Sequence, residues 1–174
     1  MTFTHHMAWH MLLVAVVAPF AAALLRGTRF DPARAAPAAC SPLVACLVEF
    51  VVVWGWHVPP LHDAARHHAA WFAAEQLSFA AAAGFLWISI LGGDPRAAAG
   101  RAATGLVALV LTFAHMTMLG VLIALAPREL YPHAAASHAD QQFGGAMMIL
   151  AGTVAYPLAA VWLSRTLVAD GGRR

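Results

Sequence analysis

The chain has 174 residues, of which 61% are hydrophobic and 10% are charged; its net charge is +2 and its mean hydropathy is +0.71. Soluble domains carry roughly 25% charged residues, so this composition excludes an ordinary water-soluble globule and indicates a one-domain membrane protein. The ten basic residues are all arginines and form no run, which excludes a typical nucleic-acid-binding surface.

Five segments are long and apolar enough to cross a membrane, which takes roughly 20 apolar residues in a helix. They fall at residues 9–25, 41–58, 69–91, 105–126 and 143–167. Polar or Pro/Gly-rich connectors separate them, and none could hold a soluble domain. We therefore predict an all-α fold, a polytopic transmembrane bundle of about five spans in a single domain, residues 1–174. The first segment lacks the basic start and cleavage site of a removed signal peptide, so we expect it to be a span.

The arginines predict the orientation of these spans, because basic residues collect in cytoplasmic loops. With five spans, one side of the membrane receives the first and third connectors and the C-terminus. Eight of the ten arginines lie there: Arg26, Arg29, Arg34, Arg96, Arg101, Arg165, Arg173 and Arg174. Only Arg66 and Arg128 lie on the other side. We predict that the N-terminus is outside and the C-terminus is in the cytoplasm.

The histidines follow the opposite distribution. Nine of the ten belong to the outer side, and only His115 lies near the middle of a span. The topology was assigned from arginine alone, so this asymmetry is independent of it. We expect the outer histidines to carry a function.

The first outer group is the stretch HHMAWHM at the start of the first span. His6 and His10 are four residues apart, as are Met7 and Met11, and this spacing places each pair on one face of a helix. Two imidazoles can hold one metal ion, and thioethers favour a soft ion such as Cu(I). The alternative is that these side chains simply lie among lipid headgroups.

The second outer group is WGWHVPPLHDAARHH. Pro59 and Pro60 end the helix that carries His57, which fixes that imidazole at the outer surface. Asp63 could bind a metal or orient a histidine. We interpret His62, His67 and His68 as solvated loop residues.

Three ionisable side chains lie inside spans, where a charge costs several kcal/mol unless it is paired or hydrated. Glu49 is near the middle of the second span. Glu75 lies in the third span, within the third of its length nearest the outer side, and His115 is halfway along the fourth span. A protonated, hydrogen-bonded Glu49 would be a sufficient structural explanation. His115 is either an inner metal ligand or an interhelical hydrogen-bond donor.

The last connector ends in ADQQFGGAMM. Asp140 precedes a predicted helix and is suited to cap its free N–H groups, while Gly144 and Gly145 allow another helix to approach closely. These motifs, together with HMAWHMLLVAVVAPF, WGWHVPPLHDAA, EQLSFAAAAGFLW and LYP, occur in the same order in a known family. The chain resembles the bacterial CtaG-type cytochrome c oxidase assembly factors over most of its length.

The resemblance implies a helical bundle in the bacterial inner membrane that assists maturation of the copper site of a haem–copper oxidase, with copper as Cu(I) held or transferred at the periplasmic face. The opening motif corresponds to His6, Met7 and His10, and the next to His57. Asp140 and Gln141 correspond to the closing motif. Family members usually have about seven spans, whereas this chain has about five. Their motif Glu-His-Leu-Ser-Phe corresponds to EQLSF here, with Gln76 at the histidine position.

Taken together with the spacing arguments above, the candidate metal ligands are His6, Met7, His10, Met11, His57 and His115, with Asp63, Glu75, Asp140 and Gln141 in support. Candidate partners are oxidase subunits, a periplasmic copper chaperone, membrane lipid and a second copy of the chain, but not nucleic acid. No catalytic motif occurs, so we expect a protein that is not an enzyme. Three alternatives stay open: a cytochrome b-like haem protein, a metal-ion transporter, and a structural oxidase-associated subunit whose histidines are incidental.

Overall fold

A computed structural model describes residues 2–94, 98–133 and 135–171 of the chain. Every regular element in these ranges is helical, which confirms the all-α prediction. The helices are α1 (Phe3–Leu12), the π-helical turn η1 (Leu13–Val17), α2 (Ala18–Leu25), α3 (Pro32–Ala35), α4 (Pro42–Trp56), α5 (Pro59–His67), α6 (Ala69–Leu91), α7 (Ala98–Ala124) and α8 (His138–Gly171).

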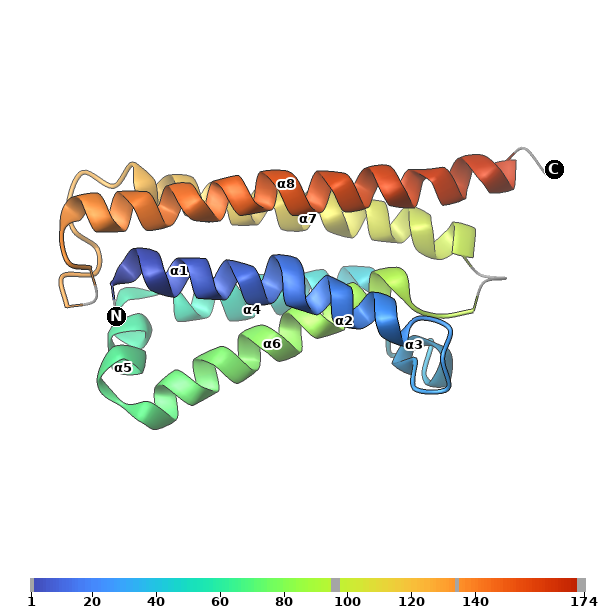
Figure 1. The fold of residues 1–174 in the computed structure, drawn as a ribbon, viewed down its shortest axis with the longest axis horizontal. Coiled ribbons are helices and arrows are strands. Elements are labelled where there is room, and N and C mark those ends of the chain that lie inside the picture. The colour runs from blue at the N-terminus through green and yellow to red at the C-terminus, as the bar shows by residue number, and fades with distance from the viewer. Residues whose placement is uncertain (1, 95–97, 134, 172–174) are drawn as a thin grey trace.

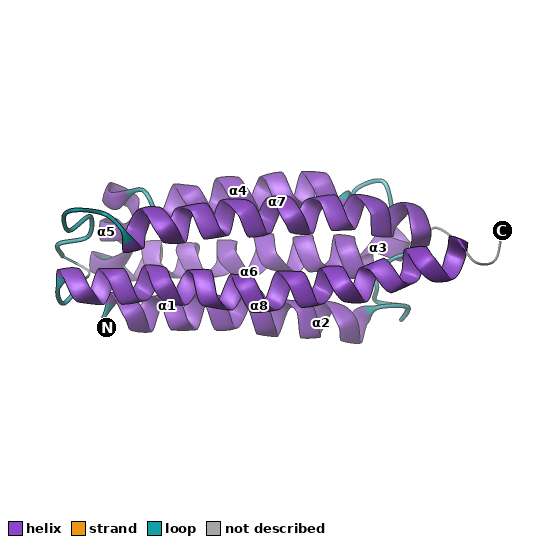
Figure 2. Cartoon of the chain, turned by 90° about the horizontal axis from the view of Figure 1, so that it is seen from above, coloured by secondary structure: helices purple, strands orange, loops and turns teal. Residues whose placement is uncertain are grey.

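The long helices run alongside one another, and the connections gather at the two ends of the bundle (Figures 1 and 2). Four helical segments are long and apolar enough to cross a membrane, or five when α4 and α5 count as one bent span. Large apolar side chains on the outside, such as those of Phe20, Leu77 and Leu125, are mostly exposed, as expected for surfaces that face lipid.

We call the end where α1 begins and α4 ends the histidine end, and the opposite end the arginine end. The beginning of α1 and the end of α8 lie at opposite ends of the bundle (Figure 1). This arrangement agrees with an odd number of crossings. Which end faces the cytoplasm stays a prediction from the arginines.

Pro19 interrupts the helical hydrogen-bond ladder of the first span. Its nitrogen carries no hydrogen, so the carbonyl four residues earlier loses its helical donor, and the π-helical turn η1 comes directly before it. Such turns occur where the helical ladder is interrupted. The indole Nε1 of Trp87 in α6 donates to the Val14 carbonyl at 2.9 Å, which joins the interrupted segment to α6.

The segment after α4 differs from the prediction of a loop. Pro59 and Pro60 do end α4, but they also begin α5, because proline is favoured in the first turn of a helix. The axis turns by 72° between α4 and α5. As a result, α5 packs one face against α6 and buries His62 and Ala65.

Glycines let α8 approach its neighbours. A Cβ on Gly145 would lie 2.7 Å from the backbone nitrogen of Ala124 in α7, and one on Gly144 would lie 2.4 Å from the Phe3 ring in α1. These contacts are far shorter than van der Waals distance, so only glycine fits at either position. The predicted close approach of helices at this motif is confirmed.

Candidate metal site

Four imidazoles gather inside the histidine end. His6 and His10 come from α1, His57 follows α4, and His62 comes from α5, and all four are at most 4% exposed. Glu75 of α6, which is 0% exposed, lies beside them. Each residue thus reaches the bundle interior from a different helix or from a different turn of α1.

His57 has the geometry of a prepared metal ligand. Its Nδ1–H donates to the Val53 carbonyl at 2.6 Å, so the lone pair of the neutral ring is on Nε2. That Nε2 is buried and has no hydrogen-bond partner among the described residues. Metal-binding histidines typically donate their other N–H to a carbonyl or carboxylate in this way. The hydroxyl of Tyr131 donates to the His57 carbonyl at 2.7 Å and fixes the backbone.

Tyr131 lies outside the apolar spans, and burial raises the pKa of its hydroxyl above the ordinary range. The hydroxyl therefore stays protonated and keeps its hydrogen bond to His57.

The four rings lie close together. The ring centroids of His10 and His57 are 5.9 Å apart, those of His57 and His62 are 6.4 Å apart, and those of His6 and His62 are 5.2 Å apart. Both nitrogens of His10 and of His62 lack hydrogen-bond partners among the described residues.

The interpretation of His62 as a solvated loop residue is wrong. His62 is 1% exposed and stands between the rings of His57 and His6. Its place depends on α5, because a helix that begins at the two prolines turns residues 62, 65 and 66 toward the interior. The sequence signal for this helix was the proline pair at its start, followed by the apolar Ala65 three residues after His62.

Glu75 links the cluster to a positive charge. One carboxylate oxygen, Oε1, faces His6 Nε2 at 3.5 Å and His62 Nδ1 at 3.7 Å. The other, Oε2, pairs closely with the Arg66 guanidinium and accepts from the Gln76 amide at 3.1 Å. The ligand atoms of His6, His62 and Glu75 lie within 4.8 Å of one another, so they could hold one metal ion.

Arg66 also contacts His6. Its Nη1 lies 3.1 Å from His6 Nδ1, and since a guanidinium can only donate, Nδ1 accepts. The proton of the neutral His6 ring is therefore on Nε2, which points at Glu75. In this arrangement His6 belongs to the Arg66–Glu75 network. A ring-nitrogen lone pair stays free on each of the other three histidines, His10, His57 and His62.

Asp140 and Gln141 hold the helices that carry the site. The carboxylate of Asp140 accepts from the backbone N–H groups of Phe3 at 2.9 Å and Thr4 at 3.1 Å, and so attaches the beginning of α1 to α8. The Gln141 amide donates to the Ile123 carbonyl at 3.2 Å, and its oxygen accepts from the backbone N–H of Leu130. These two residues connect α1, α7 and the following loop to the beginning of α8.

The remaining predicted residues lie elsewhere. Met7 packs against Gly144 of α8, and Met11 is buried in the apolar core. Asp63 is exposed and forms an ion pair with His67 at 3.4 Å, an i,i+4 contact along α5. His115 lies in α7, away from the cluster, and its ring centroid is 5.3 Å from that of Phe50. The cluster is built from imidazoles and a carboxylate, and thioether ligation stays a prediction.

Comparisons with known proteins give one finding. The family model described as cytochrome c oxidase caa3 assembly factor (Caa3_CtaG) matches residues 1–170. No curated protein and no solved structure matches the chain significantly.

Proposed function

Because the chain belongs to the family of cytochrome c oxidase caa3 assembly factors, we propose that it holds copper for transfer to the oxidase in the cluster of buried histidines. The ligand atoms of His6, His62 and Glu75 lie near enough to one another for a single ion, and His10 and His57 supply further imidazole nitrogens beside them. The observation that carries this proposal is the set of buried imidazole nitrogens without hydrogen-bond partners at the histidine end. Buried polar atoms are nearly always hydrogen-bonded, so this cluster of nitrogens without partners supports a ligand that completes it.

The donor chemistry supports a transition metal. Neutral imidazole is the metal-binding form of histidine, and burial of a ring favours its neutral state because a buried charge is costly. Imidazole suits copper, zinc, iron and nickel alike. Copper is the choice among these because the family serves a haem–copper oxidase. The ion is cargo in this proposal, and we expect no catalysis by the chain.

The arginine distribution supports a position of this site at the periplasmic face of the bacterial inner membrane. At that face the proposed partners are oxidase subunits and a periplasmic copper chaperone. The haem-binding and ion-transport alternatives gain no support from a particular feature of the site.

Copper analysis of variants tests the ligand assignment. Full-length protein without a tag is loaded with Cu(I), dialysed and analysed for copper per chain. We expect about one ion in the wild type and a clear loss in His57→Ala and His62→Ala. The matched control is His5→Ala, because His5 is exposed beside His6. Equal copper content in all four proteins would contradict the assignment.

An assembly test addresses the role of the ion. In cells that lack the protein, we expect the oxidase polypeptides to be inserted but poor in copper and inactive. Restoring wild-type protein should restore oxidase activity, whereas His57→Ala should not. Full oxidase activity without the protein would contradict the assembly role even if the isolated chain binds copper.

A further inference from the structure

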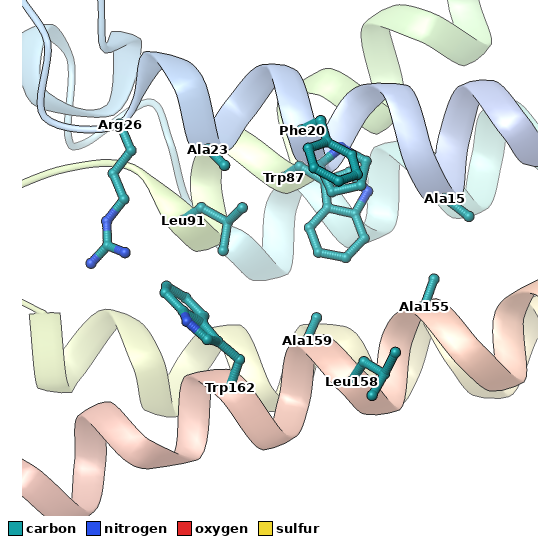
Figure 3. A pocket seen from close by; sticks show the side chains of 11 residues that line it. Ala15, Phe20, Ala23, Arg26, Trp87, Leu91, Ala155, Leu158, Ala159 and Trp162 are labelled. Atoms are coloured by element: carbon teal, nitrogen blue, oxygen red, sulfur yellow. The ribbon is translucent and has the colours of Figure 1, made fainter.

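A lateral crevice opens between α2 and α8 in the half of the bundle toward the arginine end. It has a volume of about 520 Å³, within the range of about 300–1,000 Å³ that is typical of small-molecule sites. Its walls are apolar: Phe20 comes from α2, Trp87 and Leu91 from α6, and Leu158 and Trp162 from α8 (Figure 3). None of these lining residues belongs to the metal site.

The crevice is confined to this half because α8 and the first span diverge along their length (Figure 1). At the histidine end, Phe3 and Met7 pack directly on Gly144, and no space is left. From η1 onward, the first span packs against α6, where the Trp87 indole donates to the carbonyl of Val14 in η1. The small residues Ala155 and Ala159 then leave the gap unfilled.

The length of the crevice corresponds to one membrane leaflet. The lining on the first span runs from Ala15 to Arg26, or roughly 16 Å along a helix that rises 1.5 Å per residue. Half of the ~30 Å hydrocarbon core is about 15 Å. A transmembrane helix of a partner would need a groove through both leaflets, so this geometry favours a single acyl chain.

A positive charge lies at the mouth of the crevice. The Arg26 guanidinium is 5.0 Å from the centre of the Trp162 ring, and within the described part of the chain it has no carboxylate in ion-pair distance. Figure 3 shows Arg26 at the end of the apolar walls and pointing across the opening. A phosphate group at this position would complete the pairing at headgroup level, as in basic pockets between transmembrane helices.

We propose that this crevice binds one anionic phospholipid, with an acyl chain against Trp87 and the phosphate at Arg26. The site is separate from the metal cluster and does not depend on it. A lipid held there fills the gap between α2 and α8 and fixes the distance between them at the arginine end.

Native mass spectrometry of the full chain, supplied with equal amounts of dioleoyl phosphatidylglycerol and phosphatidylcholine, tests the proposal. We expect one phosphatidylglycerol adduct, preferred by about five-fold, the effect of one arginine near a charged headgroup. Arg26→Gln should remove the preference. Arg29→Gln is the matched control, because Arg29 lies at the same end with its guanidinium over Phe30 instead, and the preference should persist.

A second variant tests the acyl-chain site. Ala155→Leu with Ala159→Leu fills the crevice while keeping good helix formers, and should abolish the adducts of both lipids with unchanged circular dichroism. Equal retention of both lipids by the wild type, an unchanged preference in Arg26→Gln, or a second copy of the chain bound in place of lipid would each overturn the proposal.

Discussion

At the arginine end, the buried carboxylate of Asp31 accepts hydrogen bonds from the backbone N–H groups of Gly27, Ala33 and Gly93, each at 3.0 Å. At the histidine end, six of the eight ring nitrogens of the four buried histidines have no hydrogen-bond partner among the described residues. Both ends bury polar groups at a cost in desolvation. Only at the arginine end does the protein itself compensate that cost. This difference between the two ends is the observation on which the proposed metal site depends.

The largest expected effect concerns the ion pair beside the cluster. Glu75→Gln leaves the Arg66 guanidinium, whose side chain is 11% exposed, without its counter-charge. Removing one partner of a buried pair costs roughly 3–5 kcal/mol of unfolding free energy, and thermal unfolding in detergent should show this loss. The double variant Arg66→Gln, Glu75→Gln should recover part of it.

The exposed pair on the same helix is the matched control for this prediction. Asp63 and His67 form an ion pair with side chains that are 41% and 58% exposed, and such pairs contribute less than about 1 kcal/mol. Asp63→Asn should therefore barely change stability. Equal losses in Glu75→Gln and Asp63→Asn would show that Glu75 is not in a buried charge network.

The next effect concerns the attachment of α1. Asp140→Ala removes the acceptor of the Phe3 and Thr4 N–H groups and of the Ala136 N–H. We expect a loss of roughly 2–3 kcal/mol in unfolding free energy, since charge-assisted hydrogen bonds are the strong ones. Copper affinity should fall as well, because α1 carries His6 and His10.

Ser137→Ala is the control at the same helix start. The Ser137 hydroxyl accepts from the Asp140 backbone N–H at 3.1 Å, and losing such a cap costs about 1 kcal/mol. Copper binding should be unchanged. If Asp140→Ala binds copper as tightly as the wild type, the attachment of α1 is not needed for the site.

Much of this fold could be predicted from the sequence, because an apolar helix that crosses the bilayer must be long enough to match its thickness. Hydropathy located the spans, and helical spacing paired His6 with His10. The convergence of these residues with His57 required the antiparallel order of the helices, which follows from successive spans joined by short connectors. The sequence pattern also gave correct reasons for glycine at positions 144 and 145.

The rest depended on tertiary contacts. We interpreted the proline pair only as the end of a helix, so α5 was not predicted. The burial of His62 and the approach of Arg66 to Glu75 both depend on α5 and were therefore missed. The hydrogen bond from His57 Nδ1 to the Val53 carbonyl selects the free nitrogen, and no sequence pattern shows a tautomer. The packing of α1 on α8 but of α2 on α6 depends on side-chain contacts, which hydropathy does not detect.

The smallest expected effect is at the arginine end. Burial raises the pKa of Asp31, but backbone N–H donors of Gly27, Gly93, Ala33 and Arg34 outweigh it and hold the pKa below its ordinary value. A carboxylate with a lowered folded pKa stabilises above its unfolded pKa of about 3.9 and loses this contribution as the pH falls through the folded value.

Asp31→Asn should therefore destabilise the protein by about 1–2 kcal/mol at pH 5 to 7, the size of a lost charge-assisted hydrogen bond. The difference from the wild type should shrink below pH 4, which thermal unfolding at pH 7, 5 and 3 would measure. A difference that grows toward pH 3 would contradict the satisfied carboxylate on which the comparison of the two ends depends.

X-ray absorption of the copper-loaded full-length chain tests the convergence of the histidines most directly. The account predicts about one copper per chain, with imidazole scattering from several rings that diminishes in His57→Ala and His62→Ala but not in His115→Ala. A spectrum of sulfur ligands without imidazole, or one that is unchanged in His57→Ala and His62→Ala, would contradict it.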